Sequence, residues 1–295
     1  MTQRDAPLFK RTRLGPLTTL GVGGEAELWE VGDERGLREA TAEPYRVLGA
    51  GSNVLIADAG VPERVIKLER AYNTIRDFNG QRDLWLGAAT PLPGLVRRAT
   101  DAGLSGLEPL LGIPAVLGGA IIMNAGTRFG EMSDVLKEVE VFVDGELQRL
   151  GADALGLEYR HSQLPKGAII TRARLHLTSS TPERVAAKVA QVDDARKGQP
   201  KIKSAGCAFK NPPGDSAGRL IDVHGLKGLR VGQAQVSFEH GNFIVNLGGA
   251  KACDVMALLE QIKGKVDVPL ESEWQLWGFD ANEKGQEEAC AAPSC

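Results

Sequence analysis

Residues 106–126 read GLEPLLGIPAVLGGAIIMNAG and carry five glycines among small and apolar side chains. A second glycine cluster, Gly49-Ala50-Gly51-Ser52-Asn53, lies between two short apolar runs. Glycine lets the backbone approach a ligand closely, and a turn of this kind can present several N–H groups to an anion. Together the two segments predict a pyrophosphate site with an apolar wall for a flat ring. The alternatives are a hairpin turn at 49–53 and a tightly packed crossover at 106–126.

The segments around these glycines alternate between strand and helix patterns. Short β-branched or apolar runs bounded by turn residues are typical of strands. They occur at Tyr45 to Leu48, Val54 to Ala57, Val65 to Leu68, Leu84 to Leu86, Val139 to Val143 and Ile169 to Leu177. Helical spacing occurs at Glu34 to Ala42 and at Pro91 to Ala102, where the proline falls in the first turn. This part of the chain is therefore predicted to mix helices with strands.

A change in composition near residue 198 predicts a boundary between two lobes. Pro182 to Lys197 has the pattern of an exposed helix, and Gly198-Gln199-Pro200 ends it. Beyond it we predict helices at Ser216 to Val223 and Ala252 to Lys265, and strands at Phe243 to Asn246 and near Trp274. From Asn282 onward, small polar residues predict a disordered tail.

A third glycine-rich stretch, Gly21 to Ala26, formally matches the G-x-G-x-x-A pattern of dinucleotide-binding folds. That pattern is informative only where a buried strand precedes it and a helix follows. Pro16 to Thr19 is a poor strand, and Glu27 to Val31 reads as a strand itself. A Rossmann-type site is therefore not predicted here.

Composition and charge exclude several classes of protein. A net charge of −3 gives no electrostatic reason to expect nucleic acid. No apolar run approaches the roughly 20 residues of a membrane span, and Met1 to Arg13 lack a signal-peptide core, so we expect no membrane contact and a cytoplasmic location. The four cysteines (Cys207, Cys253, Cys290 and Cys295) lack C-x-x-C spacing, so neither disulfides nor a metal site are expected.

Three segments carry groups suited to chemistry on a carboxylate: YRHS (159–162), SAGCAFKNP (204–212) and LESEW (270–274). An arginine can grip a carboxylate, a thiol can donate a proton, and a carboxyl can support either. Each group also has a structural reading, namely a salt bridge, a small buried cysteine and a solvated glutamate pair. The functional reading depends on their occurring together with the two glycine segments.

Four glycine-rich motifs resemble the FAD-binding module of the p-cresol methylhydroxylase type of flavoprotein: TTLGVGG (18–24), GAGSNVL (49–55), GIPAVLGG (112–119) and NAG (124–126). The resemblance implies an α+β fold, with a two-subdomain FAD-binding module at 1–178, a smaller α/β substrate domain at 179–280 and the tail at 281–295. It also implies that the following residues bind FAD: Gly49, Ala50, Gly51, Ser52, Asn53, Gly112, Ile113, Pro114, Gly118, Gly119, Asn124, Ala125 and Gly126.

The three chemical segments resemble the signature of the UDP-N-acetylenolpyruvoylglucosamine reductases, from about Leu17 to Gly278. GRLIDVHGLKGLRVGQAQVS (218–237) and HGNFIVN (240–246) extend the resemblance. It implies that Arg160 is the catalytic arginine, that Cys207 occupies the proton donor's position and that Glu273 is the catalytic glutamate. Most members have serine where this chain has Cys207. A thiol still fits that role, because its reference pKa near 8.5 keeps it mostly protonated at pH 7.

The resemblance implies that NADPH reduces bound FAD and that hydride then reaches the terminal carbon of UDP-N-acetylglucosamine enolpyruvate, giving UDP-N-acetylmuramate for peptidoglycan synthesis. Arg160 would stabilise the charge that develops, Glu273 would orient or polarise the carboxylate, and Cys207 would protonate the adjacent carbon. Two rival functions stay open at this point. One is an alcohol or hydroxy-acid oxidase on the same flavin scaffold, and the other is a flavin or sugar-nucleotide binding protein without turnover.

Four basic residues lie close together in the sequence: Arg196, Lys197, Lys201 and Lys203. This basic cluster either contacts the substrate diphosphate or forms a solvated face. The resemblance implies substrate contacts for Tyr159, Arg196 and Asn211. It also indicates the shorter-loop type of the family, type II, because no long insertion occurs between Asn211 and Gly218. We expect a monomer.

Overall fold

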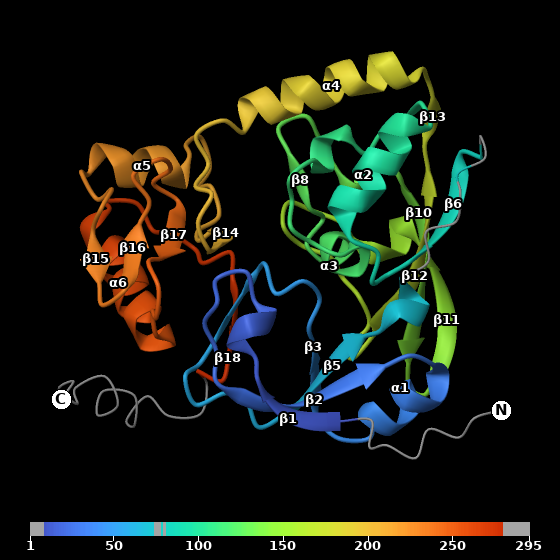
Figure 1. The fold of residues 1–295 in the computed structure, drawn as a ribbon, viewed down its shortest axis with the longest axis horizontal. Coiled ribbons are helices and arrows are strands. Elements are labelled where there is room, and N and C mark those ends of the chain that lie inside the picture. The colour runs from blue at the N-terminus through green and yellow to red at the C-terminus, as the bar shows by residue number, and fades with distance from the viewer. Residues whose placement is uncertain (1–8, 74–77, 79–80, 280–295) are drawn as a thin grey trace. The chain divides into compact units, whose positions relative to one another are not determined.

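The computed structural model describes residues 9–73, 78 and 81–279, and they form two compact units (Figure 1). The first unit holds residues 9–10 and 28–50 and the described part of 64–197. The second holds residues 11–27 and 51–63 and the described part of the chain from 198 onward. The two ranges interleave, so each unit is assembled from segments far apart in the sequence.

The first unit contains four α-helices and two main sheets. Its helices are α1 (Glu34–Ala40), α2 (Leu92–Asp101), α3 (Leu117–Ile122) and α4 (Pro182–Ala195). Its strands are β3 (Tyr45–Val47), β5 (Arg64–Leu68), β6 (Asp83–Gly87), β7 (Leu104–Ser105), β8 (Gly126–Thr127), β9 (Gly130–Glu131), β10 (Leu136–Val143), β11 (Glu146–Gly151), β12 (Ile169–His176) and β13 (Thr178–Ser179). Strands β1 (Phe9–Arg13) and β2 (Glu25–Val31) each contain a limit between the units.

One sheet has the order β1-β2-β5-β3, with β2 and β3 both parallel to β5. The other has the order β11-β10-β12-β6 and is antiparallel throughout. Figure 1 shows α2 and α3 beside this second sheet. The apolar faces of β10, β12 and α2 form one buried core, which includes Val139, Leu175 and Leu95. Such burial is the main source of stability in a unit of this size.

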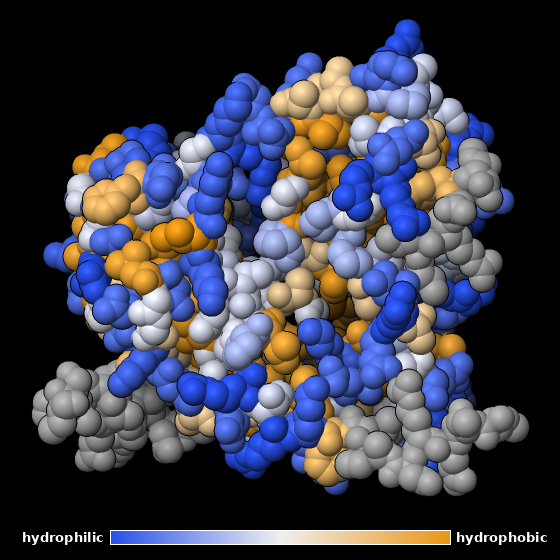
Figure 2. All heavy atoms as spheres, in the orientation of Figure 1, coloured by the Kyte–Doolittle hydropathy of each residue, from blue (hydrophilic) through white to orange (hydrophobic). Residues whose placement is uncertain are grey.

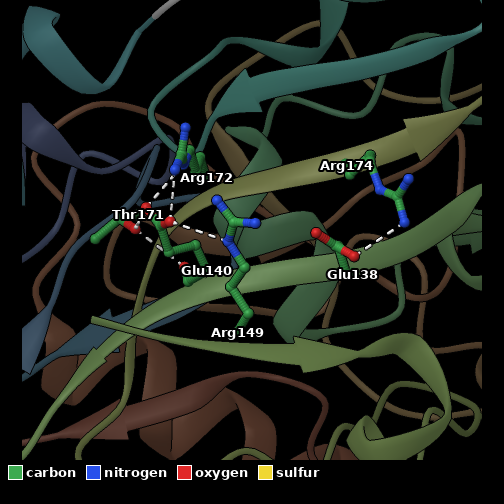
Figure 3. A network of polar contacts seen from close by, with 6 residues as sticks. All are labelled: Glu138, Glu140, Arg149, Thr171, Arg172 and Arg174. Atoms are coloured by element: carbon green, nitrogen blue, oxygen red, sulfur yellow. Dashed lines mark hydrogen bonds and ion pairs between the residues drawn. The ribbon is translucent and has the colours of Figure 1, made fainter. Parts of the chain in front are cut away.

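The face of the antiparallel sheet opposite to this core carries a network of ion pairs (Figure 3). Glu140 on β10 accepts hydrogen bonds from Arg172 on β12, at 2.7 and 2.6 Å, and lies 3.6 Å from Arg149 on β11. The hydrogen bonds from Arg172 lower the pKa of the Glu140 carboxyl. Both arginines lie over the ring of Trp85 on β6. The network therefore ties four neighbouring strands together.

The second unit packs two α-helices on a small antiparallel sheet of order β14-β17-β16-β15. Its helices are α5 (Ala217–Val223) and α6 (Ala252–Lys265). Its strands are β4 (Val54–Ile56), β14 (Ser204–Cys207), β15 (Arg230–Val231), β16 (Ala234–Val236), β17 (Phe243–Asn246) and β18 (Gln275–Trp277). Strands β4 and β18 pair in parallel. Both oxygens of Asp58 accept N–H groups at the start of α6, from Ala252 and Cys253, as expected for a carboxylate at a helix N-terminus.

The predicted α+β class is confirmed, and the predicted helices and strands occur within a few residues of their expected limits. The sequence patterns missed β1 and β11, whose residues are almost all exposed, the short helix α3 and several strands of two to four residues, such as β16. The predicted tail lies outside the described residues. On the face drawn in Figure 2, hydrophilic side chains predominate and apolar ones show between them. Within the part of the chain that the structure describes, no helix has the length and apolar character needed to cross a bilayer.

Candidate active site

An apolar pocket of about 140 Å³ lies within the first unit, where the two glycine segments meet. Gly49 contributes one edge, and Gly118, Gly119 and Ile122 of α3 contribute another. The remaining lining residues are Val47, Leu48, Lys67, Leu68, Ala88, Ala89, Val116, Ala168, Ile169 and Ile170. Mostly aliphatic walls with glycine edges suit a flat ring approached by backbone. The residues present therefore fit part of a bound FAD.

The glycines at this pocket serve different purposes. A Cβ atom at Gly118 would lie 3.1 Å from the Cβ of Ala88, so this glycine allows α3 to pack closely on the segment after β6. A Cβ at Gly49 would lie 3.1 Å from Cγ2 of Val116. A Cβ at Gly119 would meet only Val116, at 4.0 Å. Gly119 thus leaves open space at a position that lines the pocket.

Residues 51–53 of the glycine segment 49–53 belong to the second unit and make contacts there. Gly51 has a φ of +64°, and a Cβ on it would lie 2.4 Å from the carbonyl oxygen of Leu17. Its own carbonyl accepts the N–H of Thr19 at 2.9 Å. Asn53 donates from Nδ2 to the carbonyl oxygen of Glu273 at 3.1 Å. Ser52 is half-buried. Packing within the protein therefore accounts for the glycine at 51.

Arg196 contacts the glycine segment 106–126 directly. Its Nη2 donates to the carbonyl oxygen of Gly112 at 3.1 Å. Gly112 has a φ of +71°, and a Cβ there would lie 2.8 Å from Nε of Arg196. Ile113 is half-buried and packs on the core of the first unit, whereas Pro114 is exposed. The left-handed φ favours glycine at 112, and the guanidinium lies close against this backbone.

Arg160 lies in a tight turn, in which Glu158 and His161 form a β-bridge. Its φ is +56°, a left-handed conformation that is uncommon for any residue except glycine. Its guanidinium lies over the ring of Tyr159 and donates from Nη2 to the carbonyl oxygen of Gly126 at 3.1 Å. Tyr159 is 48% exposed. Arg160 and Gly126, two predicted site residues, are thus brought together.

Cys207 and Glu273 are brought together in the second unit. Cys207 ends β14 after a register shift, and Gly206 before it has a φ of +74°. The next residue, Ala208, accepts the N–H of Glu273 at 2.9 Å, and Phe209 forms a β-bridge with Ser272. Both Cys207 and Glu273 are half-buried. A thiol and a carboxyl that are far apart in sequence therefore lie on neighbouring extended segments.

Other predicted residues have defined local roles. Asn211 is exposed, and its Oδ1 accepts the N–H of Ala217 at the start of α5 at 3.1 Å. Asn124 is fully buried, with both ends of its amide bonded to main chain. Ala125 lies in the core of the first unit. Of the basic cluster, Lys197 pairs with Asp194.

Sequence reasoning did not single out two buried asparagines on or beside β17. Asn242 bonds to both main-chain groups of Phe209. Asn246 donates from Nδ2 to the carbonyl oxygen of Leu20 at 2.9 Å and accepts N–H groups from Gly248 and Ala250. The signal was present in HGNFIVN, because a buried amide in an apolar strand needs partners.

Comparison with known proteins gives two family matches. The family described as "UDP-N-acetylenolpyruvoylglucosamine reductase, C-terminal domain" matches residues 199–277. The family described as "FAD binding domain" matches residues 36–151.

Relatives that align over most of their length carry the same enzyme name as the C-terminal family. The UDP-N-acetylenolpyruvoylglucosamine reductase of Thermus thermophilus is 59% identical over 268 residues, which cover 91% of this chain and 98% of that protein. The protein of the same name from Deinococcus radiodurans is 50% identical, over 93% of this chain and 97% of its own. The crystal structure of UDP-N-acetylenolpyruvylglucosamine reductase from Thermus caldophilus aligns with a TM-score of 0.87 and 58% identity, over 91% of this chain and 98% of that one.

Proposed function

Because the chain belongs to the UDP-N-acetylenolpyruvoylglucosamine reductase family and is an FAD-dependent oxidoreductase, we propose that Arg160, Cys207 and Glu273 act on its substrate. The reaction is the NADPH-dependent reduction of UDP-N-acetylglucosamine enolpyruvate to UDP-N-acetylmuramate, a step in peptidoglycan precursor synthesis. FAD, when bound, would supply the hydride equivalents of NADPH for reduction of the enolpyruvyl double bond.

We propose that residues at the pocket of the first unit hold FAD, among them Gly49, Gly118 and Gly119. The open space beside Gly119 supports this assignment. The other cofactor residues named from the sequence are proposed with them. Two of these, Asn53 and Asn124, bond through their side chains to the protein's own main chain and would shape the loops of the site without contacting FAD.

The reaction also needs a group that donates a proton to the second carbon of the double bond. It further needs a group that stabilises the negative charge that develops on the carboxylate. Cys207 holds its proton at Sγ, for delivery to the carbon that bears the ether oxygen and the carboxylate. The guanidinium of Arg160 stabilises the charge on that carboxylate, and Glu273 orients or polarises it. The hydrogen bond from the N–H of Glu273 to the carbonyl oxygen of Ala208 supports this proposal, because it joins the extended segment of Glu273 to the one that follows Cys207.

Substitution of Cys207 tests the assignment. Rapid mixing separates reduction of the bound flavin by NADPH from its reoxidation by the enolpyruvyl sugar nucleotide. Cys207→Ala should leave reduction unchanged and slow reoxidation by about 10²-fold or more, whereas Cys207→Ser should retain most of it because a hydroxyl can also donate a proton. Cys253→Ala, in α6, is the matched control and should behave like the wild type. Unchanged reoxidation in Cys207→Ala would remove the thiol from the mechanism.

The same experiment separates the rival functions. An oxidase of alcohols or hydroxy acids would reduce its flavin with such a substrate and would not reoxidise it with the enolpyruvyl sugar nucleotide. A binding protein would show no flavin reduction by NADPH at all. Reduction followed by substrate-dependent reoxidation is expected only of the reductase.

We propose substrate contacts for Tyr159, Arg196 and Asn211. The position of Arg196 against Gly112 supports a cation near the glycine segment. We also propose that the two domains span residues 1–178 and 179–280. The protein is further proposed to be a monomer and to be located in the cytoplasm. Light scattering during size-exclusion chromatography tests the monomer, and a mass of twice the 31.5 kDa chain would exclude it.

A further inference from the structure

Three hydrogen bonds join the end of α3 to the turn that carries Arg160. Ser162 donates from Oγ to the carbonyl oxygen of Ile122 at 2.8 Å, and Asn124 donates from Nδ2 to that of Glu158 at 3.2 Å. Arg160 donates from Nη2 to that of Gly126 at 3.1 Å. All these groups belong to the first unit. The turn is thus attached to the segment 122–126 at three successive points.

Asn124 is the buried member of this set. Its side chain is fully inaccessible, and its Oδ1 accepts the N–H of Ser133 at 3.0 Å while its Nδ2 donates to Glu158. Its φ of +38° is left-handed, a conformation that asparagine tolerates better than most residues. Both ends of the amide are therefore engaged with protein main chain.

The segment that Asn124 anchors also forms part of the cofactor pocket. Gly118, Gly119 and Ile122 of α3 line it, and the main chain of Asn124 continues the turn that ends this helix. Arg160 has a left-handed φ of its own, so its turn needs contacts that hold it in that conformation. Among the three side chains that make these contacts, only that of Asn124 is fully buried.

We propose that Asn124 is a positioning residue for Arg160, and that its side chain holds the 158–161 turn instead of contacting FAD. This inference rests on the proposed role of Arg160. Its consequence is that the pocket wall and the arginine are fixed to one segment, so Arg160 has a defined place relative to the ring that fills the pocket. Positional precision of this kind has large effects on rate.

The test uses Asn124→Gly, because glycine adopts the left-handed backbone without strain and removes both side-chain hydrogen bonds. Three quantities are measured on the full chain: the Kd for FAD from flavin fluorescence, the rate of flavin reduction by NADPH, and the rate of reoxidation by the enolpyruvyl sugar nucleotide. The first two should stay within about twofold of the wild type, and reoxidation should slow by about tenfold or more. Asp33→Ala, which removes the N-cap of α1 in the same unit, controls for a general loss of stability.

Asn124→Asp provides a second variant if the smaller residue impairs folding. It keeps the size and the oxygen that accepts from Ser133, and it loses the N–H donor to Glu158. The same selective loss of reoxidation is expected. Weaker FAD binding with normal reoxidation in either variant would overturn the proposal, since the amide would then serve the cofactor.

Arg160→Ala separates this inference from the proposed function. Slow reoxidation in Arg160→Ala together with normal reoxidation in both Asn124 variants would overturn the positioning role alone. Normal reoxidation in Arg160→Ala would overturn the catalytic role of the arginine, and the positioning role with it.

Discussion

The side chain of Asn242 pairs with both main-chain groups of Phe209. Its Nδ2 donates to the carbonyl oxygen at 2.8 Å, and its Oδ1 accepts the N–H at 2.9 Å. The carbonyl oxygen of Asn242 also accepts the N–H of Ala208 at 2.9 Å. The amide thus continues the pairing of β14 with β17 beyond Cys207, where β14 ends. It fixes the segment that presents the thiol.

Replacement of Asn242 by alanine is therefore expected to be costly. It would leave a buried N–H and a buried carbonyl of Phe209 without partners, which corresponds to roughly 2–4 kcal/mol of the free energy of unfolding. Urea denaturation measures this loss. Asn73→Ala, at an exposed asparagine, is the control and should change stability by less than about 0.5 kcal/mol. Equal stability of the two variants would contradict the importance of the amide.

Gly119 allows the cofactor pocket to be blocked without disturbing the protein. Leucine at this position should fill open space in the pocket and weaken FAD binding by at least tenfold, because a Cβ there meets only Val116. The FAD-free protein should keep its melting temperature, since leucine has a higher helix propensity than glycine at this position in α3. Fluorescence titration with FAD measures the affinity.

Gly94→Leu is the matched control for this experiment. Gly94 lies in α2 of the same unit, and a Cβ on it would have nothing within 4 Å. It does not line the pocket. Normal FAD affinity in Gly119→Leu would place the flavin elsewhere.

Glu140 should contribute to stability in a pH-dependent way. Its hydrogen bonds from Arg172 lower its pKa, so its contribution is complete above its unfolded pKa of about 4.5 and is lost as the pH falls through the lower folded value. Glu140→Gln should therefore be less stable than the wild type at pH 7, with a smaller difference at pH 3. Urea midpoints at the two pH values measure it. Glu146→Gln, at an exposed residue of β11, should show no such change.

Sequence patterns predicted the longer elements that bury an apolar face, and they missed exposed strands and several very short elements. Strand β12 alternates between buried and half-buried residues along most of its length, so its periodicity was visible. Strand β11 has five exposed positions of six, and its ladder with β10 holds it in place instead. Helix α3 has only six residues, two of them glycine, which is too short for helical periodicity to be recognised.

The site was predictable as a set of segments, whereas its contacts were not. The glycine segments indicated a pocket, and Gly49, Gly118 and Gly119 do line one. Nothing in the local sequence indicated that Asn53 would bond to the main chain of Glu273, because that contact depends on the parallel pairing of β4 with β18. Long-range pairing of this kind comes from topology, which a single sequence does not encode in any short window.

His224 should give the second unit a pH dependence of the opposite sign. It directly follows α5 as the C-cap residue. Its Nδ1 contacts the carbonyl oxygen of Leu220 at 2.8 Å, and its Nε2 lies 3.2 Å from the carboxylate of Asp267. Both contacts raise the pKa of His224, and the contact with Leu220 has the larger effect. A raised folded pKa means that the stabilisation is complete below the unfolded value of about 6.5 and is lost as the pH rises through the folded one. His224→Gln should accordingly differ most from the wild type at pH 5.5 and least at pH 9, by urea midpoint. His161→Gln, at an exposed residue, serves as the control. If the difference in urea midpoint between His224→Gln and the wild type grew with pH, the imidazole would not be held as a cation.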